Sequence, residues 1–192
     1  MSYAIDVSQP TTNFDGIRQA GYNTAIIRAY RSTGAFDPHC LQNISRALAA
    51  GMQVEVYMFP SFRSGNPAGQ VDDLLSGLGQ FRTLFIWVDI ELRNPHWSAD
   101  KNQNQQFVSG LFDTLDSRGA SWGVYTNWVQ WDEIVGNNWT RGSNRLLWYP
   151  HYDGKPDFTD FRPFGGWAVP FMKQYAENAK VAGMTVDLNL RA

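Results

Sequence analysis

The chain has 192 residues, of which 43% are hydrophobic and 18% are charged, and its formal net charge is −2 at pH 7. This length suits a single domain over residues 1–192, and the hydrophobic content excludes a disordered chain. The sequence has no cluster of excess basic residues, which argues against a nucleic-acid binder. No apolar run approaches the roughly 18 residues of a membrane span. We therefore expect a globular protein that binds no nucleic acid and inserts into no membrane.

Short runs rich in β-branched and aromatic residues predict strands along the first two thirds of the chain. In chain order they lie at residues 3–6, 24–28, 53–59, 83–90 and 122–126. Helical patterns separate them, and the predicted N-caps are Asp37, Asn66 and Asp100. Strand and helix alternate, so the pattern indicates a parallel sheet covered by helices.

The last third of the chain departs from this alternation. Further strands are predicted at residues 145–149, 171–175 and 185–190. Only nine residues separate the last two strands, whereas a parallel crossover needs about a dozen. At least one late strand is therefore expected to run antiparallel. Eight strands and about five helices predict an α/β fold, an irregular TIM-like barrel shorter than a regular (β/α)8.

Two acids end the most apolar of the predicted strands. Asp89 and Glu91 are two positions apart, so on a strand both project to the same face, and Ile90 faces the opposite side. In a barrel this end of the strands carries the active site. A bare Asp-x-Glu is also common in loops and helix caps, so it specifies no function by itself.

Two more acids lie in the first and the last strand. Asp6 ends the first strand and Asp187 lies in the last one, and these strands are neighbours in a closed barrel, with the fourth strand across the lumen. We therefore expect Asp6 and Asp187 to meet Asp89 and Glu91 at one mouth. Such crowding raises the pKa of some carboxyl groups, as a general acid requires.

Aromatic and amide side chains follow the ends of the other predicted strands. Flat rings stack on sugar faces, and amides bind hydroxyl and acetamido groups. For any single ring, packing inside the barrel explains the residue equally well, but the joint pattern favours a carbohydrate cleft. The predicted sugar contacts are Tyr57, Phe59, Tyr125, Asn127, Trp148 and Gln174.

Other chemistries find little support. Ser121 lies in a G-x-S-x-G match, but a helix precedes it and a strand follows, the reverse of a nucleophile elbow. His39, His96 and His151 lack the spacing of metal ligands, and phosphate-binding loops are missing from the sequence. We therefore expect no metal and no cofactor.

Several of these segments together resemble glycoside hydrolase family 25, the Chalaropsis-type lysozymes. The match runs nearly end to end, and its segments are specific because they occur in this order and at these spacings. They include Ala4-Ile5-Asp6-Val7-Ser8, Val56-Tyr57-Met58-Phe59, Val88-Asp89-Ile90-Glu91, Leu147-Trp148-Tyr149, Lys173-Gln174-Tyr175 and Val186-Asp187-Leu188-Asn189.

The resemblance implies a (β/α)5(β)3 barrel that cleaves bacterial peptidoglycan between N-acetylmuramic acid and N-acetylglucosamine with net retention. It implies that Glu91 is the general acid and that Asp89 orients or stabilises the reacting centre through the 2-acetamido group. Asp6 and Asp187 become supporting acids. A substrate-assisted and a covalent route both remain open. From this substrate we expect a secreted, antibacterial protein that acts as a monomer.

The sequence departs from the family pattern at three positions, which we expect around the cleft. Met58 replaces the usual His, Arg28 a common Lys, and Lys173 a common Trp. One alternative stays open beside an active lysozyme, a catalytically inactive barrel that binds peptidoglycan or chitin. A family 18 chitinase is rejected, because Leu84 and Trp87 stand where its motif needs acids.

Overall fold

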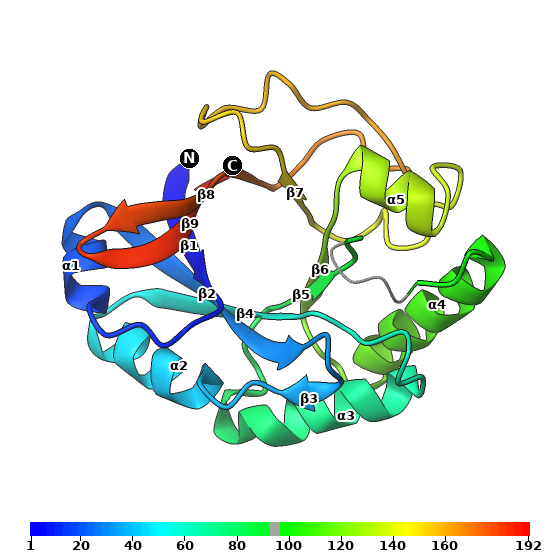
Figure 1. The fold of residues 1–192 in the computed structure, drawn as a ribbon, viewed down its shortest axis with the longest axis horizontal. Coiled ribbons are helices and arrows are strands. Elements are labelled where there is room, and N and C mark those ends of the chain that lie inside the picture. The colour runs from blue at the N-terminus through cyan, green and yellow to red at the C-terminus, as the bar shows by residue number, and fades with distance from the viewer. Residues whose placement is uncertain (93–96) are drawn as a thin grey trace.

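Eight strands form a closed ring at the centre of the computed structural model, which describes residues 1–92 and 97–192 (Figure 1). A ninth short strand, β3 (Ala35–Phe36), pairs with the end of β2 outside the ring. In ring order the barrel strands are β1 (Ser2–Val7), β2 (Tyr22–Arg31), β4 (Gln53–Met58), β5 (Ile86–Asp89), β6 (Trp122–Tyr125), β7 (Leu147–Pro150), β8 (Met172–Val181) and β9 (Met184–Arg191).

The barrel strands from β1 to β8, without β3, run parallel, and β9 closes the ring antiparallel to both β8 and β1. The expected antiparallel strand is therefore confirmed. Strand β8 extends to Val181, beyond its predicted end, because a tight turn at Ala182 and Gly183 links it to β9. Both turn residues have positive φ angles, 50° and 81°, which suits a two-residue hairpin turn.

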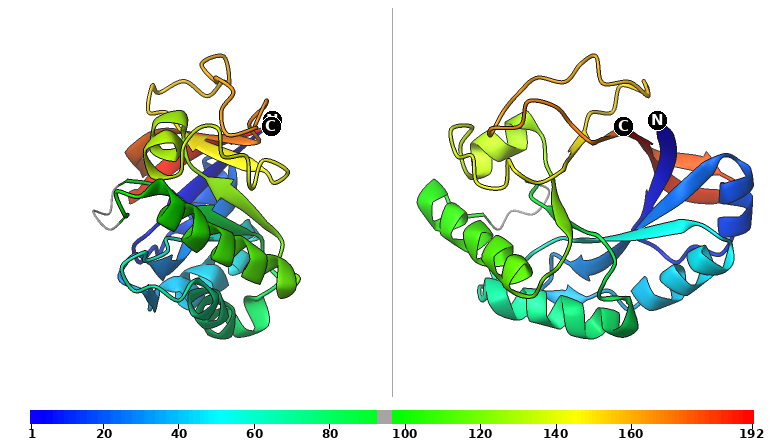
Figure 2. Two further views of the ribbon diagram at one scale, coloured as in Figure 1. Left: turned by 90° about the vertical axis from the view of Figure 1, so that its right-hand side faces the viewer. Right: turned by 180° about the vertical axis from the view of Figure 1, so that it is seen from behind.

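Helices cover the outside of the first five barrel strands. Within the described residues, no helix lies between β7 and β8, and the irregular segment 151–171 covers β7 and the start of β8 instead (Figures 1 and 2). This arrangement confirms the irregular (β/α)5(β)3 barrel. No helix in the described part of the chain has the length and apolar character to cross a membrane. The helices are α1 (Phe14–Gln19), α2 (Cys40–Ala49), α3 (Pro67–Leu78), α4 (Lys101–Ser117) and α5 (Trp128–Ile134), with a short 3-10 turn η1 (Gly79–Phe81).

Two of the three predicted helix starts are confirmed. Asn66 Oδ1 accepts a hydrogen bond from Gly69 N at 3.1 Å, and Asp100 Oδ1 accepts one from Asn102 N at 2.9 Å. The prediction for Asp37 is wrong, because α2 begins at Cys40. Asp37 lies in the turn before the helix. Its Oδ1 accepts a hydrogen bond from His39 N at 2.9 Å, and its Oδ2 pairs with Arg28 Nε on β2 at 2.8 Å.

The core has two layers. One lies between the strands and the helices, and the other fills the inside of the barrel. Trp87 is at the centre of the inner layer, 5.7 Å from the Trp148 ring and 4.9 Å from the Phe85 ring between centroids. Its indole nitrogen donates to Glu55 Oε2 at 2.7 Å, and Arg191 binds the other Glu55 oxygen. Much of the aromatic content therefore packs the barrel interior, below the mouth.

Side-chain alternation along β4 corrects one expectation. Tyr57 points into the mouth, so Met58 points the other way and is fully buried in the outer core layer. Its departure from the family pattern therefore lies away from the cleft.

Candidate active site

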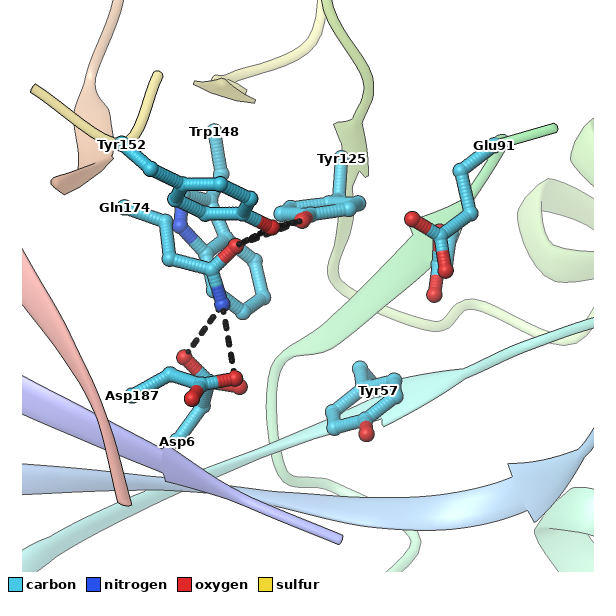
Figure 3. Close-up of a pocket in the computed structure, with 9 residues that line it drawn as sticks. Asp6, Tyr57, Glu91, Tyr125, Trp148, Tyr152, Gln174 and Asp187 are labelled. Carbon is cyan, nitrogen blue, oxygen red and sulfur yellow. Dashed lines mark hydrogen bonds between the residues drawn. The ribbon is translucent and has the colours of Figure 1, made fainter. Parts of the chain in front are cut away.

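The four predicted acids lie together at one end of the barrel (Figure 3). Asp6 and Asp89 come from the ends of β1 and β5, and Glu91 follows β5 by two residues. Asp187 reaches the same place from the first half of β9, because that strand runs in the opposite direction. The predicted convergence is confirmed. These acids line one pocket with Tyr57, Tyr125, Trp148, Tyr152 and Gln174.

Asp89 and Glu91 share a face, as their spacing predicts. Both line the pocket, whereas Ile90 between them is fully buried in the outer core layer. Asp89 is 5% exposed and Glu91 is half-buried at the pocket edge. Trp97 donates a hydrogen bond from Nε1 to the Glu91 carbonyl at 2.9 Å, which fixes the backbone that carries this carboxylate.

Asp6 and Asp187 form an acid pair across the β1–β9 ladder, where their Cα atoms are direct partners. Asp6 is 5% exposed and accepts hydrogen bonds on Oδ2 from Gln174 Nε2 and Asn189 Nδ2, both at 2.8 Å. Burial and, second, the Asp187 charge raise the pKa of Asp6 to about 8, although the two amide hydrogen bonds lower it. Asp6 therefore keeps its proton at neutral pH.

Gln174 lies between this acid pair and two tyrosines. Its Nε2 donates to Asp6 and, at 3.4 Å, to Asp187 Oδ2. Its Oε1 accepts hydrogen bonds from the hydroxyls of Tyr125 at 2.6 Å and Tyr152 at 3.0 Å (Figure 3). The amide thus spans the mouth from β1 and β9 to the opposite wall.

Four aromatic residues line the pocket, Tyr57, Tyr125, Trp148 and Tyr152. The Trp148 ring is 4.5 Å from the Tyr125 ring and 6.4 Å from the Tyr57 ring, both in edge-on arrangements. Burial, followed by the Asp6 charge, raises the pKa of Tyr57 well above its usual value. Burial likewise raises the pKa of Tyr125 well above the usual range. Both phenols therefore stay protonated and neutral at physiological pH.

Two predicted sugar contacts lie outside this set of lining residues. Asn127 caps α5, accepting from Gln130 N at 3.0 Å, and it borders an adjoining hollow beside Glu91. Phe59 follows the end of β4 and is not one of the described residues that line the pocket. Neither observation tests whether a bound sugar would reach them, so their role stays a prediction.

Tyr152 is a pocket residue that the sequence analysis missed. It lies two residues beyond the end of β7, as Glu91 lies two residues beyond β5. A search of the positions just after each strand, and not only of the strand ends, would have found it.

Lys173 does not face the cleft, contrary to expectation. It is fully buried on the outer side of β8, and its Nζ is 3.0 Å from Asp153 Oδ2 and 2.7 Å from Asp160 Oδ1. His151 Nδ1 lies 2.6 Å from the other Asp160 oxygen. We call these four residues the lysine–aspartate cluster.

The lysine–aspartate cluster includes three side chains with the spacing of metal ligands, His151, Asp153 and Asp160. The ammonium group of Lys173 already supplies positive charge to both carboxylates. Burial raises the pKa of Asp160, but hydrogen bonds from Lys173, His151 and Tyr149 outweigh it and leave this pKa below its usual value. The contacts describe an ion-pair clasp between segment 151–171 and β8. His96 lies outside the described residues.

The alternative nucleophile Ser121 lies at the far end of the barrel. It is exposed and precedes β6, in the turn that follows α4, whereas the acids lie beyond the other ends of the strands. This order confirms a helix-to-strand turn and lacks the strand–serine–helix arrangement of a nucleophile elbow.

Comparisons with known proteins agree with this geometry. The family described as Lysozyme-like protein 1 matches residues 1–175. The protein called "Probable GH family 25 lysozyme 5" from Dictyostelium discoideum is 40% identical over 191 residues, covering 96% of this chain and 88% of that protein. A muramidase from Trichobolus zukalii has a similar fold, with a TM-score of 0.82, 20% identity, and coverage of 100% and 94% of the two chains.

A family GH25 lysozyme from Aspergillus fumigatus is similar as well, with a TM-score of 0.81, 22% identity, and coverage of 100% and 93%. At these identities the two solved structures support the barrel, and the more similar curated relative supports the family. The chain belongs to glycoside hydrolase family 25, the lysozymes.

Proposed function

We propose that this protein is an N-acetylmuramidase that hydrolyses the β-1,4 bond between N-acetylmuramic acid and N-acetylglucosamine in bacterial peptidoglycan. The observation that carries the proposal is the convergence of Asp6, Asp89, Glu91 and Asp187 on one aromatic-lined pocket. The names of its relatives, which include lysozymes and a muramidase, support the same reaction. We further propose that it acts outside the cell, where this polymer is found.

In the proposed mechanism Glu91 protonates the oxygen of the leaving sugar. It is the more exposed member of the Asp89–Glu91 pair, at the pocket edge, where a leaving group can depart. Asp89, more deeply buried, orients the 2-acetamido group so that its carbonyl oxygen attacks the anomeric carbon. Water then opens this intermediate and the product keeps its configuration.

A covalent route remains an alternative for the same pair of acids. In that route Asp89 itself attacks the anomeric carbon and water later releases the sugar, also with net retention. The chemistry of the substrate separates the routes, because a glycan without 2-acetamido groups can react only by the covalent one.

The second candidate function is a barrel that binds peptidoglycan or chitin without cleaving it. The aromatic rings would serve such a binder equally well. The acids argue against it, because a buried Asp6 beside Asp187 is unfavourable for folding and a binder has no use for it. We therefore favour the enzyme.

Replacement of Glu91 by Gln tests the proposal. We expect Glu91→Gln to lower the release of reducing ends from purified peptidoglycan at least about 100-fold, because general acid catalysis is lost. The matched control is Glu133→Gln, which changes an exposed glutamate on α5 and should leave the rate unchanged. Full activity in a folded Glu91→Gln variant would contradict the assignment of Glu91. Wild-type protein that binds cell walls and releases no reducing ends would favour the binder.

A further inference from the structure

We propose that Gln174 is a positioning residue that joins the acid pair of β1 and β9 to the tyrosine hydroxyls on the opposite wall, and so fixes the direction of the hydrogen bonds in the pocket. The sequence analysis predicts Gln174 as a sugar contact. Its surroundings favour a different role. The inference rests on the proposed muramidase function and names a further residue on which that function depends.

The hydrogen-bonding capacity of Gln174 is fully used by the protein. A glutamine amide has two N–H donors and two carbonyl lone pairs. Both donors have carboxyl partners, in Asp6 and Asp187, and both lone pairs have phenol partners, in Tyr125 and Tyr152. Gln174 is also 3% exposed. A sugar could bind to this amide only by displacing one of these partners.

The orientation of the amide follows from a neighbour that can only donate. The Trp148 indole N–H donates to Asn189 Oδ1 at 2.9 Å, so Asn189 must present its Nδ2 to Asp6 Oδ2. That oxygen is then an acceptor, and the proton of Asp6 belongs on Oδ1. Gln174 consequently also presents its Nε2 to Asp6 Oδ2, and its carbonyl faces the tyrosines.

This orientation sets what the tyrosines can offer to a sugar. Each hydroxyl has one proton. Gln174 Oε1 is 2.6 Å from the Tyr125 oxygen and 3.0 Å from the Tyr152 oxygen, whereas the two phenol oxygens are 3.4 Å apart, so the shorter contacts direct both protons to Gln174. Burial raises the pKa of Tyr152 to about 12, so this phenol keeps its proton at physiological pH. The remaining lone pairs of Tyr125 and Tyr152, which both line the pocket, therefore make that edge of the pocket an acceptor, suited to a hydroxyl or acetamido N–H group of the substrate.

The same amide controls the acid pair. Gln174 donates hydrogen bonds to two carboxyl groups that are direct partners on neighbouring strands. The amide carries no charge, so it stabilises these groups by hydrogen bonds alone. Without this donor, the ionised forms of Asp6 and Asp187 would lose a hydrogen bond and the tyrosine hydroxyls would turn toward the pocket. Both changes alter the chemistry of the site without removing a group that touches the substrate.

The test replaces Gln174 with Met, which has a similar length and no hydrogen-bonding capacity. In the full chain, Gln174→Met should lower the rate of reducing-end release about tenfold or more and move the limb of the pH profile that Asp6 controls to higher pH. Carbon-13 NMR titration of the Asp6 carboxyl should show the same shift, and this readout needs no activity. Gln42→Met, an identical change at an exposed position on α2, should leave both unchanged.

Two results would overturn the inference. One is a Gln174→Met variant with activity within about twofold of wild type and an unshifted Asp6 titration. The other is a loss of activity that is uniform across pH with an unshifted titration, because that pattern indicates a structural role alone. If the wild-type protein released no reducing ends, the proposed function would fail, while the Asp6 titration would still decide whether Gln174 controls the acid pair.

If Gln174→Met does not fold, a second variant, Gln174→Glu, tests the same role. Gln174→Glu keeps the shape, and in its protonated form the new carboxyl can still accept from the tyrosines and donate to an acid. Once it ionises it can only accept. We expect activity nearest to wild type at low pH and a steep decline as pH rises. A pH profile like that of the wild type would overturn the inference.

Discussion

Two neighbouring residues on β8 hold carboxyl groups in opposite ways. Lys173 points outward and binds Asp153 and Asp160 with a buried ammonium group, and the pKa of both aspartates is lowered. Gln174 points inward and binds Asp6 and Asp187 with a neutral amide. Burial and the Asp187 charge raise the pKa of Asp6 to about 8, because a hydrogen bond from this amide lowers it too little to offset them. A buried cation keeps two aspartates ionised in a structural ion pair. A neutral amide supplies no charge, so one acid of the other pair keeps its proton and is available for proton transfer.

The two groups of acids also affect the pH dependence of stability in opposite directions. The folded protein holds the proton of Asp6 more tightly than the unfolded chain does, so Asp6 costs no stability below its ordinary pKa of 3.8 and becomes unfavourable as pH rises toward 8. Asp153 and Asp160 behave in the opposite way. Their contribution is complete above their ordinary pKa and is lost as pH falls through the lowered values.

The largest expected effect comes from removing the buried carboxyl group of Asp6. Asp6→Asn should lower the rate of peptidoglycan hydrolysis about 100-fold or more and yet raise the unfolding free energy at pH 8 by about 2 kcal/mol, because the unfolded chain is no longer favoured by ionisation of Asp6. Activity assays and urea unfolding measure the two effects. Asp153→Asn, the same change on the other face of the barrel wall, should lower stability instead. Equal losses of stability in both variants would break the comparison.

The next largest effect concerns the clasp. Lys173→Met should destabilise the fold by about 2–3 kcal/mol, because two carboxylates lose their cation. Asp153 and Asp160 are 20% and 19% exposed, so solvent screening keeps this value below that of a fully enclosed ion pair. Urea unfolding at pH 7 measures it. A stability equal to that of the wild type would show that segment 151–171 is held to β8 by its apolar contacts alone.

A smaller effect appears in the pH profile of the wild-type protein. Thermal unfolding from pH 3 to pH 9 should show a decline in melting temperature toward low pH, from the clasp, and a separate decline from about pH 4 toward pH 8, from Asp6. Asp6→Asn should remove only the second decline. If that variant kept both, the raised pKa of Asp6 would be wrong.

The smallest effect is expected at an exposed ion pair. Arg118 binds Asp72 at 2.8 Å, but the two side chains are 47% and 48% exposed. Because exposed ion pairs are screened, Asp72→Asn should leave the melting temperature unchanged within error. A shift as large as that of Lys173→Met would show that burial does not account for the strength of the clasp.

The sequence predicted the parts of the site that depend on strand ends. Asp6, Asp89, Glu91 and Asp187 could be placed together because strand polarity and closure decide where such residues lie. Met58 and Lys173 were wrongly expected around the cleft, although alternation from Tyr57 and Gln174 places them on the opposite face.

The remaining features depend on tertiary contacts that no local pattern reveals. The predicted cap at Asp37 is wrong because residues 38 and 39 form a turn before α2 begins, and the ion pair of Asp37 with Arg28 of β2 is a tertiary contact. Tyr152 and the lysine–aspartate cluster lie on segment 151–171 or contact it, and this segment has neither helical nor strand periodicity. The partners of such a segment become visible only once the barrel has positioned it.

The sugar at the newly formed reducing end tests the central claim most directly. Purified peptidoglycan would be digested with the wild-type protein, the soluble fragments reduced with borohydride, and their terminal sugar alcohols identified by mass spectrometry. Cleavage by a muramidase predicts that N-acetylmuramic acid, in its reduced form, is the new end in every fragment. Reduced N-acetylglucosamine as the new end, or no new reducing ends at all, would contradict the account.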